Sequence, residues 1–121
     1  RFPDMSETYA KGLQEAISSA AALLNITLRK GVYASVQGPM LESPEEYRFL
    51  RTIGADAVGM STVPEVIVAK HSGMSCAAVI VLTDECDPDN LKPINIADIL
   101  ETAARAEEKL ILLIPEVIRS I

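Results

Sequence analysis

Three polar or glycine-containing clusters in this sequence hold residue types that could do chemistry. They span residues 38–43, 59–62 and 83–87. Glu42 in the first cluster could accept hydrogen bonds from a heterocyclic N–H, or could simply lie near a helix N-terminus, where the helix dipole favours a carboxylate. The second cluster, a glycine followed by hydroxyls, is typical of a helix N-terminus that binds an anion, although Thr62 could also be only a cap. Asp84 is either a loop cap or a functional acid.

The elements expected around these clusters place each of them at the end of a strand. Apolar and β-branched runs predict strands over residues 31–37, 56–60 and 75–83. Amphipathic spacing predicts helices over residues 5–24, 44–54 and 63–73, and a long helix from Asn95 onward. This alternation predicts an α/β fold, a three-layer sandwich with a largely parallel or mixed central sheet. Ligands bind such sheets outside the carboxyl ends of the strands, so the three clusters are expected to form one site.

Local signals mark where the helices begin. Ser43-Pro44-Glu45-Glu46 combines a serine cap, a proline at the first helical position and a glutamate at the third. Thr62-Val63-Pro64-Glu65 is expected to repeat this capping. Asp4 and Glu7 are expected to cap the first helix, and Asn95 with Asp98 the last.

Composition excludes several classes of function. The 121 residues carry a net charge of −6 and their basic residues are scattered, which argues against binding nucleic acid. No apolar run approaches the roughly 20 residues that span a bilayer. Two cysteines and one histidine give neither a disulfide framework nor a zinc site, so we expect a reducing, cytoplasmic location and no metal. The chain also lacks the glycine-rich dinucleotide and nucleotide-phosphate motifs and the serine elbow of hydrolases.

Longer stretches resemble a known family. The segments that carry the likeness are Gly31-Val32-Tyr33 through Gly38-Pro39, Leu41-Glu42, and above all the run from Gly54 to Ala69, Gly-Ala-Asp-Ala-Val-Gly-Met-Ser-Thr-Val-Pro-Glu-Val-Ile-Val-Ala. They closely resemble the trimeric purine nucleoside phosphorylases of the 6-oxopurine type. The likeness extends over essentially the whole chain and matches the C-terminal half of such an enzyme. It therefore implies that residues 1–121 are half of a single phosphorylase domain.

The resemblance implies a reaction. This family cleaves the N-glycosidic bond of a purine nucleoside with inorganic phosphate as co-substrate, without a cofactor, and releases the free base and ribose 1-phosphate in purine salvage. Catalysis there consists of holding phosphate under the sugar and stabilising the leaving base with hydrogen bonds. The family's phosphate loop lies upstream of the matching half, and its trimer completes each pocket with a neighbour's aromatic residue. We therefore expect a homotrimer as the full-length protein and no activity from this chain alone.

The resemblance also assigns roles to individual residues. Glu42 and Asp84 take the catalytic positions, Glu42 accepting from purine N1–H and Asp84 lying near N7 and the 6-substituent. Ser61 takes the position of a phosphate contact. The other positions implied to bind substrate are Leu41, Val58, Gly59, Met60, Thr83, Ile96 and, with weaker support, Tyr9.

Two departures from the family pattern bear on the substrate. Asp84 stands where the 6-oxopurine enzymes have asparagine, and Ile96 stands where they have a histidine near the ribose 5′-hydroxyl. Both resemble the methylthioadenosine phosphorylases of the same superfamily, whereas Glu42 opposes that reading because adenine N1 is an acceptor. Three alternatives stay open: a methylthioadenosine phosphorylase, a non-catalytic purine-binding or structural fragment, and a nucleoside hydrolase that uses water.

Overall fold

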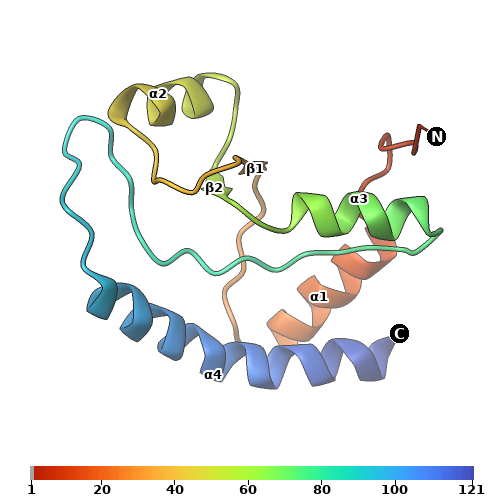
Figure 1. Ribbon diagram of the computed structural model, residues 1–121. Helices are drawn as coiled ribbons and strands as arrows, with labels where there is room; N and C mark the ends of the chain where they lie inside the picture. The colour runs from red at the N-terminus through yellow and green to blue at the C-terminus, as the bar shows by residue number, and fades with distance from the viewer. Residues whose placement is uncertain (1) are drawn as a thin grey trace.

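The computed structural model describes residues 2–121 and orders the elements α1-β1-α2-β2-α3-α4. Figure 1 shows α4 along the lower edge, with α1 against its C-terminal part, and a small β-sheet lying between α2 and the other helices. A long extended segment after α3 runs between this upper group and α4 before the chain turns into α4. None of the helices in the described residues is long and apolar enough to cross a membrane.

The sheet within the chain is a parallel pair. β1 (Tyr33–Ser35) and β2 (Ala57–Gly59) pair in the register Tyr33 with Ala57 and Ser35 with Gly59. Asp56 holds the start of the pair, because its Oδ2 accepts from the Val32 N–H at 2.7 Å while its own N–H donates to the Val32 carbonyl at 2.9 Å. The α/β class with parallel strands is thus confirmed, with both strands shorter than expected.

The strand expected over residues 75–83 is not formed, which corrects the sequence-based prediction. The segment is extended, but within the described residues no strand lies hydrogen-bonded beside it. Among residues 2–121, its one backbone hydrogen bond with another segment is the Ala10 N–H donating to the Cys76 carbonyl at 2.8 Å. An extended run becomes a strand only by pairing, so apolar sequence alone does not create one.

The first capping prediction for the central helices is confirmed and the second is wrong. α2 (Pro44–Thr52) begins with a full capping box, in which Ser43 accepts from the Glu46 N–H and the Glu46 carboxylate accepts from the Ser43 N–H at 2.7 Å. α3 (Val63–His71) begins without a side-chain cap. Thr62 has φ 70° and ψ −57°, and the Val63 N–H donates to the Ser61 carbonyl at 2.8 Å, which makes Thr62 the centre of a γ-turn.

The core lies between the first and last helices. α1 (Lys11–Leu23) packs on α4 (Ile96–Ser120), and Ala20, Ala21, Leu113 and Val117 are buried between them. As expected, Asn95 caps α4 by accepting from the Ala97 N–H at 3.0 Å.

The start of α1 differs from the prediction, while its end agrees. The helix does not begin near Asp4, because the Asp4 Oδ1 accepts from the Ser6 N–H at 2.9 Å in a local turn. Met5 and Tyr9 therefore precede the helix. At its C-terminus, Asn25 ends α1 in the left-handed conformation with φ 55°.

Candidate functional site

A cleft of about 1130 Å³ runs along β2 and past its carboxyl end, bounded by α2 on one side and by the segment that leads to Asp84 on another. Its volume is slightly above the roughly 300–1,000 Å³ that is typical of a small-molecule site. Residues from all three predicted clusters line it together. The predicted site residues among its lining are Leu41, Glu42, Val58, Gly59, Met60, Ser61, Thr83 and Asp84.

Two of the residues named from the sequence do not line this cleft. Tyr9 precedes α1, near the point where Ala10 meets Cys76. Ile96 is the first residue of α4 and is 69% exposed, and its near neighbours Ile94 and Ile99 line the cleft instead. Thr83 and Asp84 also border an adjoining cavity of about 470 Å³ that reaches Asn95 and Asp98 at the start of α4.

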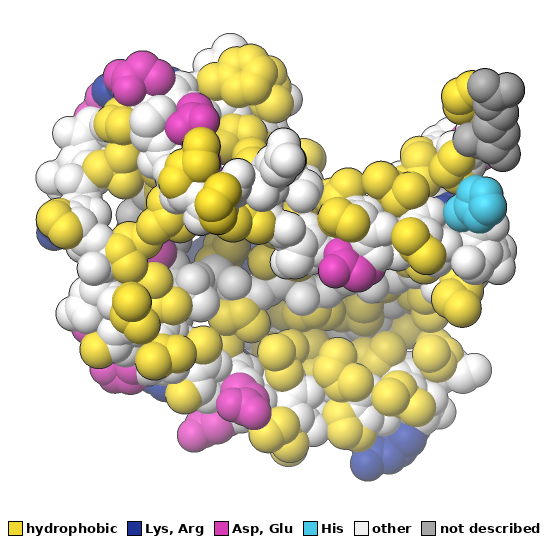
Figure 2. Space-filling model, viewed as in Figure 1, with side chains coloured by type: hydrophobic (Ala, Val, Ile, Leu, Met, Phe, Trp, Pro, Cys, Tyr) yellow, Lys and Arg dark blue, Asp and Glu magenta, His cyan; other side chains and the backbone are white. Residues whose placement is uncertain are grey.

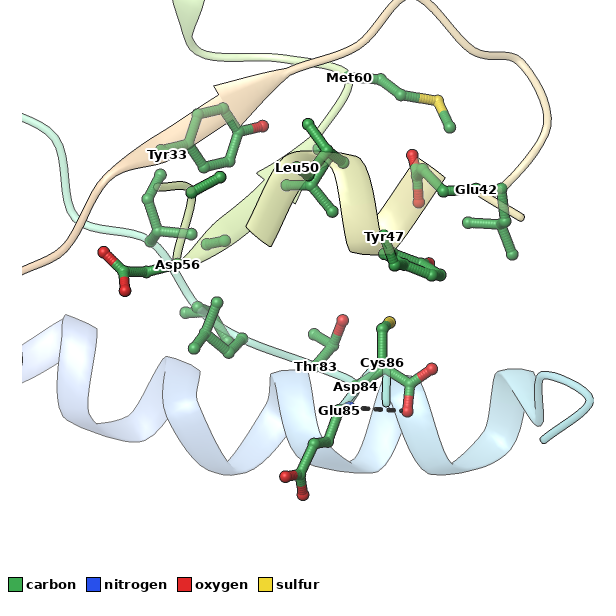
Figure 3. A pocket seen from close by; sticks show the side chains of 18 of the residues that line it. Tyr33, Glu42, Tyr47, Leu50, Asp56, Met60, Thr83, Asp84, Glu85 and Cys86 are labelled. Atoms are coloured by element: carbon green, nitrogen blue, oxygen red, sulfur yellow. Dashed lines mark hydrogen bonds between the residues drawn. The ribbon is translucent and has the colours of Figure 1, made fainter. Parts of the chain in front are cut away.

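Glu42 is placed by the turn that precedes α2. The Gly38–Pro39 peptide bond is cis, and Gly38 has φ 68°. A side chain at Gly38 would collide with the Met60 sulfur, so only glycine lets this turn lie against the Met60 side chain. Glu42 itself is half-buried, and Figure 3 shows its carboxylate on the same side of the cleft as Met60.

The corner at Gly59–Thr62 is packed against Tyr33. A Cβ added to Gly59 would collide with the Tyr33 hydroxyl, and that hydroxyl accepts from the Ser61 N–H at 3.4 Å. The N–H groups of Ser61 and Val63 are thus both engaged within the chain. Since the Ser61 N–H is already engaged, Ser61 would contact an anion through its hydroxyl.

Asp84 offers one carboxylate oxygen to a ligand. Its Oδ1 accepts from the Glu85 N–H at 2.9 Å, which fixes the carboxylate plane and leaves Oδ2 for another partner. Asp84 is exposed at the rim of the cleft. In Figure 3 the side chains of Asp84 and Cys86 lie across the cleft from Glu42, whereas Glu85 is turned away toward α4.

The sequence reasoning missed Tyr47. This α2 residue is 9% exposed and lines the cleft, and its hydroxyl lies beside the side chains of Cys86 and Glu42. Burial is the main cause that raises the pKa of the Tyr47 hydroxyl, and the contacts with Cys86 and Glu42 raise this pKa further. The sequence feature that could have pointed to Tyr47 is its position on the helix that begins just after Glu42. Its neighbour Cys86 is distant in sequence, so the sequence carries no sign of that contact.

A second contact joins α2 to the acidic loop. Arg48 donates to the Asp89 carboxylate at 2.7 Å and to the Pro88 carbonyl at 3.4 Å, and it also pairs with Glu45 at 3.0 Å. The hydrogen bond from Arg48 is the largest cause that holds the pKa of Asp89 below its ordinary value. Tyr47 and Arg48, which are consecutive in α2, therefore contact the loop that follows Asp84 at two places, Cys86 and Asp89.

The cleft contains no cluster suited to a metal. Within residues 2–121, no three His, Cys, Asp or Glu side chains come together as a metal site. Both cysteines are free thiols. The groups that line the cleft are carboxylates, hydroxyls, a thiol, the Arg51 guanidinium and apolar side chains, which suits binding a planar heterocycle by hydrogen bonds and packing.

Comparison with known proteins finds close relatives. The chain is 42% identical to purine nucleoside phosphorylase 1 of Bacillus subtilis over 118 residues, which is 98% of this chain and 44% of that protein. It is 37% identical to the purine nucleoside phosphorylase of Mus musculus, over 91% of this chain and 39% of that protein. The chain thus spans less than half the length of these relatives.

A solved structure and a family profile agree with these sequence matches. The crystal structure of isoform 2 of purine nucleoside phosphorylase from Schistosoma mansoni, in complex with cytosine and ribose-1-phosphate, superposes with a TM-score of 0.90 at 37% identity. The superposition covers 97% of this chain and 42% of that one. The sequence profile of the Phosphorylase superfamily matches residues 1–119, and the chain belongs to this superfamily.

Proposed function

We propose that the full-length protein containing this chain is a purine nucleoside phosphorylase, which converts a purine nucleoside and phosphate into free base and ribose 1-phosphate. The observation that carries the proposal is the cleft at the strand ends, where Glu42, residues 59–61 and Asp84 line one space. Relatives that carry this name at 37–42% identity support it. So does a structural neighbour with ribose-1-phosphate bound.

The chemistry of the lining fits the two halves of a nucleoside. Glu42 and Asp84 supply hydrogen-bonding carboxylates for the edge of the base, and Leu41, Val58 and Met60 supply apolar surface for its faces. Phosphorolysis builds negative charge on the leaving purine, so a donor or a proton at the base edge stabilises the transition state. Ser61 is proposed to contact phosphate, which acts as co-substrate, and the reaction needs no other cofactor.

The chain is proposed to be the C-terminal half of one phosphorylase domain. Large apolar side chains lie exposed on both sides of the hollow between the upper elements and α4, as Figure 2 shows. The exposed large apolar side chains of α4 and of the unpaired segment include Ile80, Leu82, Leu100, Ile111, Leu112 and Ile118. The rest of the domain is proposed to cover this surface, since such exposure is unusual for a complete soluble fold. We further propose a homotrimer in a reducing, cytoplasmic compartment, the latter supported by the two free thiols.

The second candidate is a methylthioadenosine phosphorylase. The free Oδ2 of Asp84 favours it, because an ionised carboxylate accepts from a 6-amino group but cannot donate to O6. Glu42 in the same cleft favours a 6-oxopurine, whose N1–H is a donor. We place the 6-oxopurine substrate first because Glu42 lines the cleft together with residues 59–62, the stretch that most resembles the 6-oxopurine enzymes.

Base release by the purified full-length protein tests the proposal. Inosine, guanosine, adenosine and methylthioadenosine are each incubated with and without phosphate, and release is followed by absorbance. Phosphate-dependent cleavage of inosine or guanosine is expected. Cleavage of methylthioadenosine alone would reassign the substrate, cleavage without phosphate would indicate a hydrolase, and no cleavage would refute the proposal. The 121-residue chain alone is expected to be inactive.

A further inference from the structure

Tyr47 is a buried polar group for which the proposed reaction has so far no role. It is 9% exposed, which is unusual for a hydroxyl-bearing side chain beside an open cleft, and its ring belongs to the buried face of α2 with Leu50. Figure 3 shows the ring between the side chains of Glu42 and Cys86. These two residues come from different segments, one before α2 and one after Asp84.

The chemistry of the three groups allows one order of hydrogen bonds. An ionised carboxylate only accepts, a thiol is a weak donor, and a phenol can do both. The Tyr47 hydroxyl, which lies beside both side chains, can therefore donate its single proton to Glu42, with the Cys86 thiol next to it. A hydrogen bond to a carboxylate orients its plane, so the Glu42 oxygen that faces a base is set by Tyr47.

The same helix also holds the loop that carries Asp84. Arg48 pairs with Asp89 at 2.7 Å, and Tyr47 contacts Cys86, which lies two residues beyond Asp84. α2 thus contacts the loop on two adjacent residues, while its capping box fixes its N-terminus directly after Glu42. The helix is in direct contact with the neighbours of both base-binding carboxylates.

We propose that Tyr47 is a positioning residue of the base site, which orients Glu42 and, through Cys86, sets the place of Asp84 across the cleft. The proposal rests on the proposed function, because it treats Glu42 and Asp84 as the groups that bind the purine. Tyr47 does not itself need to touch the substrate. Its loss is therefore expected to act through Glu42.

A double-mutant cycle in the full-length protein tests this dependence. Tyr47→Phe keeps the ring and removes only the hydroxyl, and it is combined with Glu42→Gln. Tyr47→Phe is expected to lower kcat/KM for inosine about tenfold in the wild-type background, as for loss of a hydrogen bond to a charged group. In the Glu42→Gln background it is expected to change kcat/KM by less than about twofold, because the partner is already altered. Equal effects in both backgrounds would overturn the proposal.

Two further measurements separate positioning from packing and from the proposed function. Leu50→Ile disturbs the same buried face of α2 without changing a polar group, and its effect on kcat/KM is expected to be the same in both Glu42 backgrounds. Alkylation of Cys86 by iodoacetamide, followed by peptide mass spectrometry, is expected to quicken several-fold in Tyr47→Phe and not in Leu50→Ile, with Cys76 unchanged in both. If the wild-type protein cleaves no purine nucleoside, the proposed function fails, and the alkylation alone decides whether Tyr47 joins Cys86 to the site. Unchanged alkylation of Cys86 would then overturn the inference.

Discussion

Replacing Asp84 with asparagine should change which purine the protein prefers. Asp84→Asn is nearly isosteric, and the Oδ1 that accepts from the Glu85 N–H at 2.9 Å can keep that bond. The amide nitrogen then takes the position of Oδ2. The free position facing the base thus changes from an acceptor to a donor, with no change in the position of the loop.

The size of the effect follows from that single exchange. A 6-oxopurine presents N7 and O6, which are both acceptors, and an acceptor held against a carboxylate oxygen goes unpaired at a cost of about 1–3 kcal/mol. Asp84→Asn removes this conflict, so kcat/KM for inosine should rise by about tenfold or more. The 6-amino group of adenosine loses its acceptor, so kcat/KM for adenosine should fall.

The assay is phosphate-dependent base release from inosine and adenosine by the full-length protein. Glu85→Gln removes the same charge from the neighbouring residue, whose side chain is turned away from the base side of the cleft (Figure 3), and should leave the inosine-to-adenosine ratio within about twofold. An unchanged ratio in Asp84→Asn would refute the placement of Asp84 against the base. Equal shifts in both variants would show a general effect of charge instead.

Three further predictions concern the framework of the site, each measured in the full-length protein. Ser43→Ala removes the capping box of α2 and should lower the free energy of unfolding by about 1 kcal/mol in denaturant titrations, whereas Ser43→Asp should retain most of it; equal losses would contradict the capping role. Leu113→Ala empties a position that is 1% exposed and should cost about 2–5 kcal/mol, against less than about 0.5 kcal/mol for the exposed Glu108→Ala on the same helix. Gly59→Ala forces the Tyr33 hydroxyl away from Ser61 and should raise the KM for phosphate; an unchanged KM would separate this corner from the phosphate site.

The parts of the fold that could be predicted from the sequence depend on short-range chemistry. Three helix ends depend only on partners within a few residues, so the local sequence was enough to predict them. They are the capping box at Ser43, the cap at Asn95 and the end of α1 at Asn25. Thr62 looked like another cap, but it is the centre of a γ-turn at a corner that also contacts Tyr33, a residue distant in sequence. The apolar run over residues 75–83 has a strand's composition, yet pairing depends on a neighbour that its own sequence does not describe.

The candidate site divides in the same way. Glu42 follows the run that contains β1, and residues 58–61 end the run that contains β2, so their meeting in one cleft follows from parallel topology. Asp84 ends an extended run that reaches the same cleft without pairing as a strand. Tyr47 could not be found in this way, because its role depends on a helix facing a loop from a distant part of the chain. Ile96 was named from a family position, and it lies at the exposed start of α4 instead of in the cleft.

The most direct test of the central claim is the rate of base release from inosine by the full-length protein, measured with and without phosphate and repeated with Glu42→Gln. The wild-type protein should release hypoxanthine only when phosphate is present and should form ribose 1-phosphate in equal amount. Glu42→Gln should lower kcat/KM about tenfold or more, because it removes the acceptor proposed for N1–H. Release that is independent of phosphate, or a Glu42→Gln protein as active as the wild type, would contradict the proposal.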